Sequence, residues 1–434
     1  MTAKVLLSGV CVLTLGARSP NFTLGDVLIE DGVVAEVGTG LRSRDAEQMD
    51  MTDTVVMPGF VDTHRHAWTS LFRNLGDGAL SDPWSSPAAI GDYLQADDVY
   101  AATLVGLLGA VEAGITTVVD WSHIRTEDGC ADAALQAHAD AGLRTVLAVT
   151  GRVTREVVDR LTAAAGPSTS IALGSSLRSS DLGAIAEEWG LARELGLRVH
   201  AHATPGSSGR GVISDLARRG LLGEDVTLVH GADLDDGDVD AIASSGASVS
   251  LTPSTDVAND LGRTPIVQQL IDRHIRPGLG IDDARATPGD MFAQMRATNS
   301  MQHATVFDLR LAGKGGVPRL MGTRDVIRHA TVDGARVAGL ARVTGSLEPG
   351  MQADVIVLRT DRANIFPIND PIGAVVWGMD TSNVDWVFVR GRVLMRGGVL
   401  ESDVQRARDL AVTARDRVFA ASGLAVGGVA RSDG

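Results

Sequence analysis

Short apolar runs alternate with amphipathic stretches along the middle of the chain, between residues 57 and 345. Eight strand-like runs separated by helical stretches predict an α/β fold, in which a parallel sheet closes into a (β/α)8 barrel of the TIM type. The predicted strands are 55–64, 115–123, 143–150, 170–176, 197–203, 226–231, 247–253 and 276–282. The predicted helices are 98–114, 131–142, 155–166, 182–195, 213–220, 238–246 and 265–274.

Both ends of the chain have a different pattern, with short strands joined by turns. The sequence Glu-Asp-Gly at 30–32 lies between apolar runs and predicts a β-hairpin. Strand-like runs return at 345–358, 374–379, 384–395 and 397–400, and a helix is expected within 401–423. We therefore expect a small β-sandwich domain from 1–56 and 346–400, a barrel at 57–345, and a C-terminal helix and tail at 401–434.

Charge and composition narrow the class of protein. The net charge of −15 argues against a nucleic-acid partner or an anionic membrane surface, because both need clustered cations. The two cysteines give no disulfide framework, which favours a reducing, cytoplasmic location. The apolar N-terminus is interpreted as a strand and not as a signal peptide, because it lacks a small-residue cleavage site. No run is long and apolar enough to span a bilayer.

Histidines and one carboxylate lie where the predicted barrel strands end. His64 and His66 are two residues apart, so both side chains leave the same face of their strand. His202 ends the fifth strand, His230 the sixth, and Asp282 the eighth. The carboxyl ends of barrel strands meet at one rim, so these groups can reach one point. Imidazole and carboxylate ligands suit zinc, iron or manganese.

The other histidines have a structural interpretation, because a lone histidine is more often a hydrogen-bonded structural residue than a ligand. His123, after the second strand, is the strongest exception, since it too lies at the active rim. The others are His138, His274, His303 and His329.

Four motifs carry a resemblance to a known family. They are PGFVDTHRH at 58–66, VHG at 229–231, GLGID at 278–282 and GSLEPGMQADVIVL at 345–358. With them the chain resembles the amidohydrolase superfamily, in its cytosine deaminase-like, chlorohydrolase and aminohydrolase (ATZ/TRZ-type) branch, over nearly its whole length. The resemblance implies an enzyme that hydrolyses a C–N bond, and commonly a homo-oligomer.

The same resemblance implies roles for the rim residues. One divalent metal, zinc before iron or manganese, would be held by His64, His66, His202 and Asp282. His230 would hydrogen-bond the attacking water or the substrate. The metal lowers the pKa of water to about 7, and Asp282 can then accept the proton. The favoured reaction is deamination of an N-heterocycle or cyclic amidine.

Lysine usage bears on the number of metals. Binuclear members of the superfamily bridge two metals with a carboxylated lysine at the end of strand four. This chain has lysine only at Lys4 and Lys314, and neither lies on a predicted barrel strand. A lysine-bridged site is excluded, and a mononuclear site is favoured.

One position departs from the family pattern. Many deaminases of this branch carry a proton-shuttling glutamate three residues after the strand-five histidine, where this chain has Pro205. Asp282 could carry the proton both ways, His123 or His230 could share the task, or the substrate needs no ring protonation. Three alternatives stay open: an amide or ring hydrolase, a lyase, isomerase or cyclase, and a binding protein without catalytic activity. The full ligand set argues against the binding protein.

Substrate-binding residues are predicted from their place near the rim. Aromatic walls and an arginine suit a flat, polar ligand. Packing or a surface salt bridge is an equally good interpretation for several of these residues. The candidates are His123, Trp68, Trp84, Arg73, His200 and Arg285, with Trp121, Thr255 and Asp256 noted by position alone.

Overall fold

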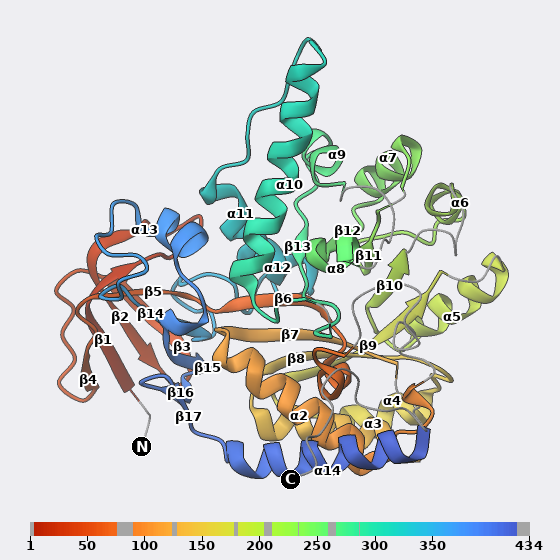
Figure 1. Ribbon diagram of the computed structural model, residues 1–434, viewed down its shortest axis with the longest axis horizontal. Coiled ribbons are helices and arrows are strands. Elements are labelled where there is room, and N and C mark those ends of the chain that lie inside the picture. The colour runs from red at the N-terminus through yellow and green to blue at the C-terminus, as the bar shows by residue number, and fades with distance from the viewer. Residues whose placement is uncertain are drawn as a thin grey trace, which may run out of the picture.

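The chain folds into a barrel with a smaller β-sheet at one side (Figure 1). This computed structural model describes residues 4–75, 90–123, 128–177, 181–203, 211–232, 234–258, 266–285 and 287–422. In Figure 1 the small sheet lies to the left of the barrel and is built from both ends of the described chain.

Eight parallel strands close the barrel, in the order in which they follow one another along the chain. All eight lie within the runs predicted from the alternation of apolar and amphipathic segments, apart from one residue at the ends of the first and the fourth. The strands are β6 (Phe60–Arg65), β7 (Ile115–Ser122), β8 (Arg144–Val149), β9 (Thr169–Ser176), β10 (Val199–Ala203), β11 (Val226–His230), β12 (Ser248–Leu251) and β13 (Gly278–Leu279).

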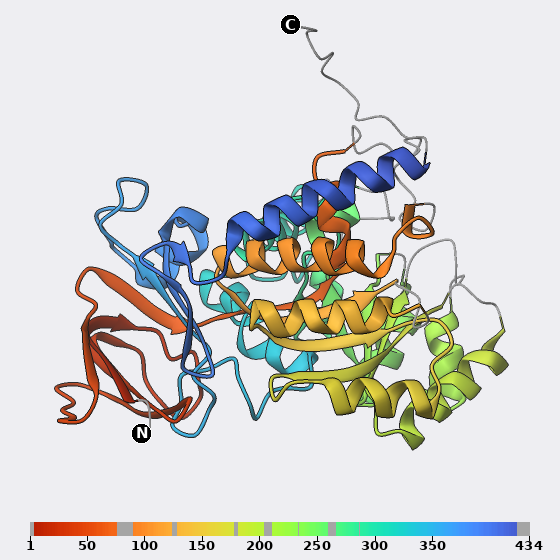
Figure 2. The ribbon, with the colours of Figure 1, turned by 90° about the horizontal axis from the view of Figure 1, so that it is seen from below.

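Helices follow the strands and cover the barrel (Figures 1 and 2). Seven correspond to predicted helices: α2 (Ala96–Glu112), α3 (Cys130–Ala141), α4 (Arg155–Ala164), α5 (Leu182–Glu194), α6 (Val212–Arg218), α7 (Asp236–Ser245) and α9 (Val267–Asp272). Among the described residues of the barrel, five further helical segments lie outside the predicted helices: η1 (Ala67–Phe72), α8 (Pro253–Ala258), α10 (Met291–Leu311), α11 (Thr323–His329) and α12 (Val332–Val337).

Helix α10 was missed because polar residues occupy its buried stripe. Gln294, Thr298, Asn299 and Gln302 are all buried, so hydrophobic periodicity is weak there. Most of their polar atoms have hydrogen-bond partners within the protein. Gln302, for example, donates from Nε2 to the side-chain oxygen of Gln268 over 2.6 Å.

Two glycines allow β13 to approach β6 closely. A Cβ at Gly280 would lie 2.8 Å from the carbonyl oxygen of His64, and one at Gly278 would lie 2.5 Å from the Thr63 side chain. Any side chain there would push apart the two strands that carry His64 and lead to Asp282.

The small sheet has nine strands, which are hydrogen-bonded into one mixed sheet around their own apolar core. The Glu-Asp-Gly hairpin is present, with Asp31 and Gly32 at φ of 52° and 78°, as a type I′ turn requires. The strands are β1 (Lys4–Val12), β2 (Phe22–Glu30), β3 (Val33–Gly38), β4 (Glu47–Asp50), β5 (Thr54–Pro58), β14 (Val355–Arg359), β15 (Val384–Val389), β16 (Arg392–Arg396) and β17 (Val399–Leu400).

Three strand predictions need correction. Of the run expected at 345–358, only the end forms a strand, β14 (Val355–Arg359). The single strand expected at 55–64 is two strands, because Gly59 separates β5 of the small sheet from β6 of the barrel. The strand expected at 374–379 is wrong: these residues form the π-helical turn η3 (Ala374–Gly378) after α13 (Pro371–Gly373). Asp370 caps α13 by accepting from Ile372 N, and Pro371 fixes a helical φ, which overrides the β-propensity of the following valines.

The C-terminal helix was predicted correctly. Helix α14 (Val404–Ser422) runs alongside α2, and Arg417 of α14 pairs with Asp98 of α2 (Figure 2). Among the helices described here, none combines the length and the apolar character needed to cross a bilayer.

Candidate metal centre

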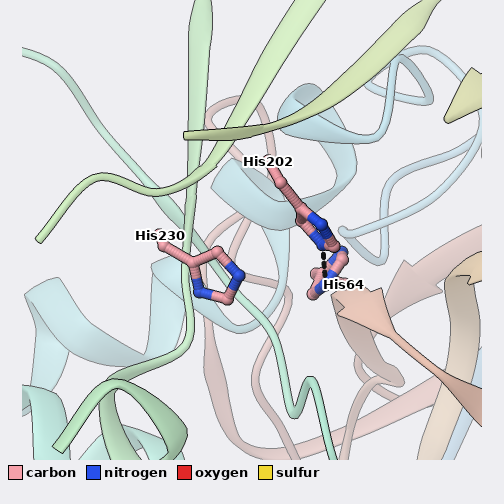
Figure 3. A group of neighbouring side chains, drawn as sticks. All are labelled: His64, His202 and His230. Atoms are coloured by element: carbon pink, nitrogen blue, oxygen red, sulfur yellow. Dashed lines mark hydrogen bonds between the residues drawn. The ribbon is translucent and has the colours of Figure 1, made fainter. Parts of the chain in front are cut away.

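Five side chains meet at the carboxyl ends of the barrel strands. Asp282 Oδ1 lies 3.2 Å from His64 Nε2 and 3.0 Å from His66 Nε2. His202 Nε2 lies 3.1 Å from His64 Nε2, and Figure 3 shows these two rings meeting tip to tip, with the His230 ring facing them. The donor atoms of His64, His202 and His230 all lie within 4.8 Å of one another.

This donor set fits a divalent metal. The Nε2 atoms of His64 and His202 face each other, and a carboxylate oxygen of Asp282 lies next to them. Nitrogen and carboxylate ligands brought together in this way suit zinc and its neighbours in the first transition row. His64, His66, His202, His230 and Asp282 could therefore bind a divalent metal.

Burial keeps His64 and His202 neutral, and hydrogen bonding keeps Asp282 ionised. Burial lowers the pKa of His64 to about 4 and lowers that of His202 well below its usual value. Burial alone would raise the pKa of Asp282, but hydrogen bonds from His64 and His66 hold it well below its ordinary range. Neutral imidazoles and an ionised carboxylate are the species that coordinate metals.

The backbone at two of these residues is strained. His230 has φ of 73° and Asp282 has φ of 63°, in the left-handed region that residues with a Cβ rarely adopt. Asp282 is fixed there by two backbone bonds to β6: its N–H donates to His64 O, and His66 N donates to Asp282 O. Backbone bonds of 2.8 and 2.9 Å thus couple the first and last barrel strands at the site.

A buried ion pair lies behind the first-strand histidines. Arg65 Nε donates to Asp62 Oδ2 over 2.6 Å, and the Arg65 side chain is only 1% exposed. Asp62 Oδ1 accepts from Ile281 N at 3.0 Å and from His64 N at 3.3 Å. Asp62 therefore joins the segment before Asp282 to the strand that carries His64.

Removal of this carboxylate should destabilise the fold. We expect Asp62→Ala to lower the free energy of unfolding by about 3–5 kcal/mol, because it leaves Arg65 buried without its partner. Asp132→Ala, which breaks an exposed pair with Arg160, should cost about 1 kcal/mol or less. Denaturant unfolding of both variants is the measurement, and equal losses would contradict a supporting role for Asp62.

Residues around the site orient the rings of His66, His202 and His230. His66 donates from Nδ1 to the Trp121 carbonyl over 2.6 Å, which leaves Nε2 for the site. The His230 Nδ1 atom lies 2.9 Å from Asp256 Oδ1 and 2.8 Å from Thr252 Oγ1. The Trp121 ring stacks on His202 with centroids 4.1 Å apart.

Among the predicted substrate contacts, His123 lies beside the proposed ligands. Its ring centroid is 4.2 Å from that of His66, and the side chain is exposed. His200 lies buried on β10 two residues before His202, and burial lowers its pKa to about 3. Trp68 is 1% exposed and packs in an apolar cluster with Phe72.

The two predicted arginines each have a contact within the protein. The Arg73 guanidinium lies against Gly109 of α2. Arg285 Nε donates to Asp283 Oδ2 over 2.5 Å. Trp84 and Pro205 lie outside the described residues.

Two other histidines make structural hydrogen bonds, as expected. Buried His138 lies 2.8 Å from Asp120 Oδ2 through Nε2 and 2.9 Å from Thr145 Oγ1 through Nδ1. His303 donates from Nε2 to the Met321 carbonyl.

The sequence prediction missed the roles of Asp62, Thr252 and Asp256. Asp256 had been noted only because it follows strand seven, and no spacing rule connects it with His230, 26 residues earlier. A carboxylate one turn beyond a barrel strand was the available signal.

The family model of the amidohydrolase family matches residues 55–394. A 5′-deoxyadenosine deaminase from Methanothermobacter thermautotrophicus is 28% identical over 92% of this chain and 94% of its own. A 5-methylthioadenosine/S-adenosylhomocysteine deaminase from Symbiobacterium thermophilum is 27% identical over 90% of this chain and 93% of its own.

Solved structures share the fold. An adenosine deaminase from Xanthomonas campestris with bound zinc superposes with a TM-score of 0.82 at 19% identity, covering 96% of this chain and 99% of that one. An atrazine chlorohydrolase from Arthrobacter aurescens complexed with zinc gives 0.80 at 20% identity, covering 95% and 100%. With its family model spanning most of its length, the chain belongs to the amidohydrolase family and is a hydrolase that acts on carbon–nitrogen bonds.

Proposed function

We propose that this protein is a mononuclear, zinc-dependent deaminase of adenine-bearing nucleosides that are modified at the 5′ position. The observation that carries the proposal is the convergence of His64, His66 and His202 Nε2 with Asp282 Oδ1 at the barrel rim. The substrate class is supported by the full-length relatives, which are deaminases of 5′-deoxyadenosine and of 5-methylthioadenosine and S-adenosylhomocysteine.

The proposed metal ligands are His64, His66, His202 and Asp282. A divalent ion held there supplies a Lewis acid that lowers the pKa of water to about 7. One metal is proposed because β9 (Thr169–Ser176), the fourth barrel strand, contains no lysine that could bridge a second.

Asp282 and His230 perform the remaining chemistry. Asp282 Oδ1 faces the two first-strand histidines, and its carboxylate accepts the proton of the attacking water. His230 lies across the site from His64 and hydrogen-bonds that water or the substrate. Attack of the water oxygen on the ring carbon that carries the amino group gives a tetrahedral intermediate. The proton taken by Asp282 then passes to the amino group, and loss of ammonia leaves a carbonyl there.

Proline at position 205 favours a second candidate. Without a glutamate there, a substrate whose leaving group needs no ring protonation would suit the site, as in hydrolysis of an amide or a cyclic C–N bond. His123, exposed beside His66, is the group best placed to assist a leaving nitrogen.

Ammonia release tests the proposed function. Zinc-loaded protein should release ammonia from 5′-deoxyadenosine, 5-methylthioadenosine or S-adenosylhomocysteine and leave the corresponding inosine product. The matched 5′-deoxyinosine, which lacks the amino group, should release none. If no aminated heterocycle yields ammonia while one zinc per chain is present, deamination is wrong, and cyclic amides become the substrates to test.

A further inference from the structure

We propose that Asp256 is a positioning residue that keeps the imidazole proton of His230 on Nδ1 and so presents Nε2 of that ring to the reaction site. This assignment deepens the proposed function and rests on it for its catalytic consequence. The tautomer itself can be tested without turnover.

The contacts of Asp256 define the tautomer. Asp256 Oδ1 lies 2.9 Å from His230 Nδ1 and accepts from Thr252 Oγ1 over 2.8 Å. An ionised carboxylate can only accept hydrogen bonds, so Nδ1 carries the hydrogen. When the ring is neutral, Nε2 then carries the free lone pair. Figure 3 shows one ring nitrogen of His230 on the side that faces His64 and His202.

The contact between Asp256 and His230 is shielded from water. The Asp256 residue is 2% exposed and His230 is 3% exposed, so water does not compete freely for either group. Asp256 Oδ2 is buried and has no hydrogen-bond partner among the described residues. A buried oxygen without a hydrogen-bond partner lowers the stability of the fold, so this site retains a carboxylate against its own stability. The other carboxylate oxygen, Oδ1, contacts His230, and this contact explains why a carboxylate occupies the position.

Helix α8 links His230 with the segment that carries Asp282. Asp256 lies on α8, which directly follows β12, and its neighbour Thr255 donates from Oγ1 to the Ile281 carbonyl over 3.0 Å. Asp282 follows Ile281 in the chain. One short helix thus braces both the ring of His230 and the backbone next to the proposed base.

The tautomer decides what His230 can do. With the proton on Nδ1, Nε2 accepts a hydrogen bond from the attacking water and orients its lone pair toward the substrate. With the proton on Nε2, the ring would donate and turn the water away from that orientation. Carboxylates fix histidine tautomers in this way in the Ser-His-Asp triad. This matters more where the strand-five glutamate is replaced, as it is by Pro205.

Nitrogen-15 NMR of histidine-labelled, zinc-loaded protein tests the proposal, with His230→Gln used to assign the His230 signals. We expect wild type to carry the proton on Nδ1. Asp256→Asn, which preserves shape, should move it to Nε2 or produce a mixture, because the amide can donate to Nδ1. Thr252→Val removes the other contact to Nδ1 and should leave the tautomer unchanged.

Kinetics form the second measurement. Asp256→Asn should lower kcat by about 10- to 100-fold, while KM and zinc content change by less than about 3-fold. A wild-type proton on Nε2 would overturn the proposal whether or not the variant folds. So would an Asp256→Asn enzyme with wild-type kcat. If the tautomer is as expected but no nucleoside is deaminated, the proposed function fails while the structural assignment stands.

Discussion

Protein in which His64 and His66 are both replaced by alanine should purify without bound metal and without activity. Two of the four proposed ligands are lost, one from β6 (Phe60–Arg65) and the other from the residue that follows this strand. Since Lewis-acid activation supplies several kcal/mol, kcat/KM should fall by at least about 1,000-fold. Metal analysis of wild type should give about one zinc, iron or manganese per chain, as the mononuclear site requires.

A matched control removes two histidines away from the site. His274 is exposed at the end of α9, and His303 bonds the Met321 carbonyl, so His274→Ala with His303→Ala should keep both metal and activity. Wild-type protein that holds no metal even after reconstitution would contradict the mechanism. Equal metal loss in both double variants would show that the purified protein loses metal for other reasons.

Asp282→Asn should retain the fold but lose about 100- to 10,000-fold in kcat. The amide keeps the shape of the side chain but cannot accept the proton of the attacking water. It also weakens the bonds to His64 and His66, which now meet a neutral oxygen. Steady-state ammonia release, with zinc content measured on the same samples, separates loss of the base from loss of the metal.

The neighbouring carboxylate supplies the control. Asp283 pairs with Arg285 and accepts from the Arg285 backbone N–H, so Asp283→Asn changes the same charge one residue away. We expect that variant to keep most of its activity. Asp282→Asn with full zinc content and kcat near wild type would remove Asp282 from the role of base.

Parts of the fold followed directly from the pattern of side chains. The alternation of apolar strands and amphipathic helices predicted all eight barrel strands, and Asp31-Gly32 predicted its hairpin. The prediction failed where local chemistry competed with propensity. The apolar residues 374–379 favour a strand, but the cap at Asp370 and the proline at 371 begin a helical turn.

Helix α10 (Met291–Leu311) was not predicted, for another reason. Its buried stripe includes Gln294, Asn299 and Gln302, whose amides hydrogen-bond to partners distant in sequence. A buried face that is polar gives no hydrophobic period, so a single sequence contains no signal for it.

The sequence by itself determined which side chains could meet. Side chains alternate along a strand and the carboxyl ends of barrel strands share one rim, so His64, His66, His202, His230 and Asp282 converge through local rules alone. The tertiary structure alone decided how those groups are held. The bond from Asp256 to His230, the placement of Arg73 against α2, and the pairing of Asp62 with Ile281 are contacts between segments far apart in sequence. Their geometry depends on how helices and strands pack together, which no local pattern of residues contains.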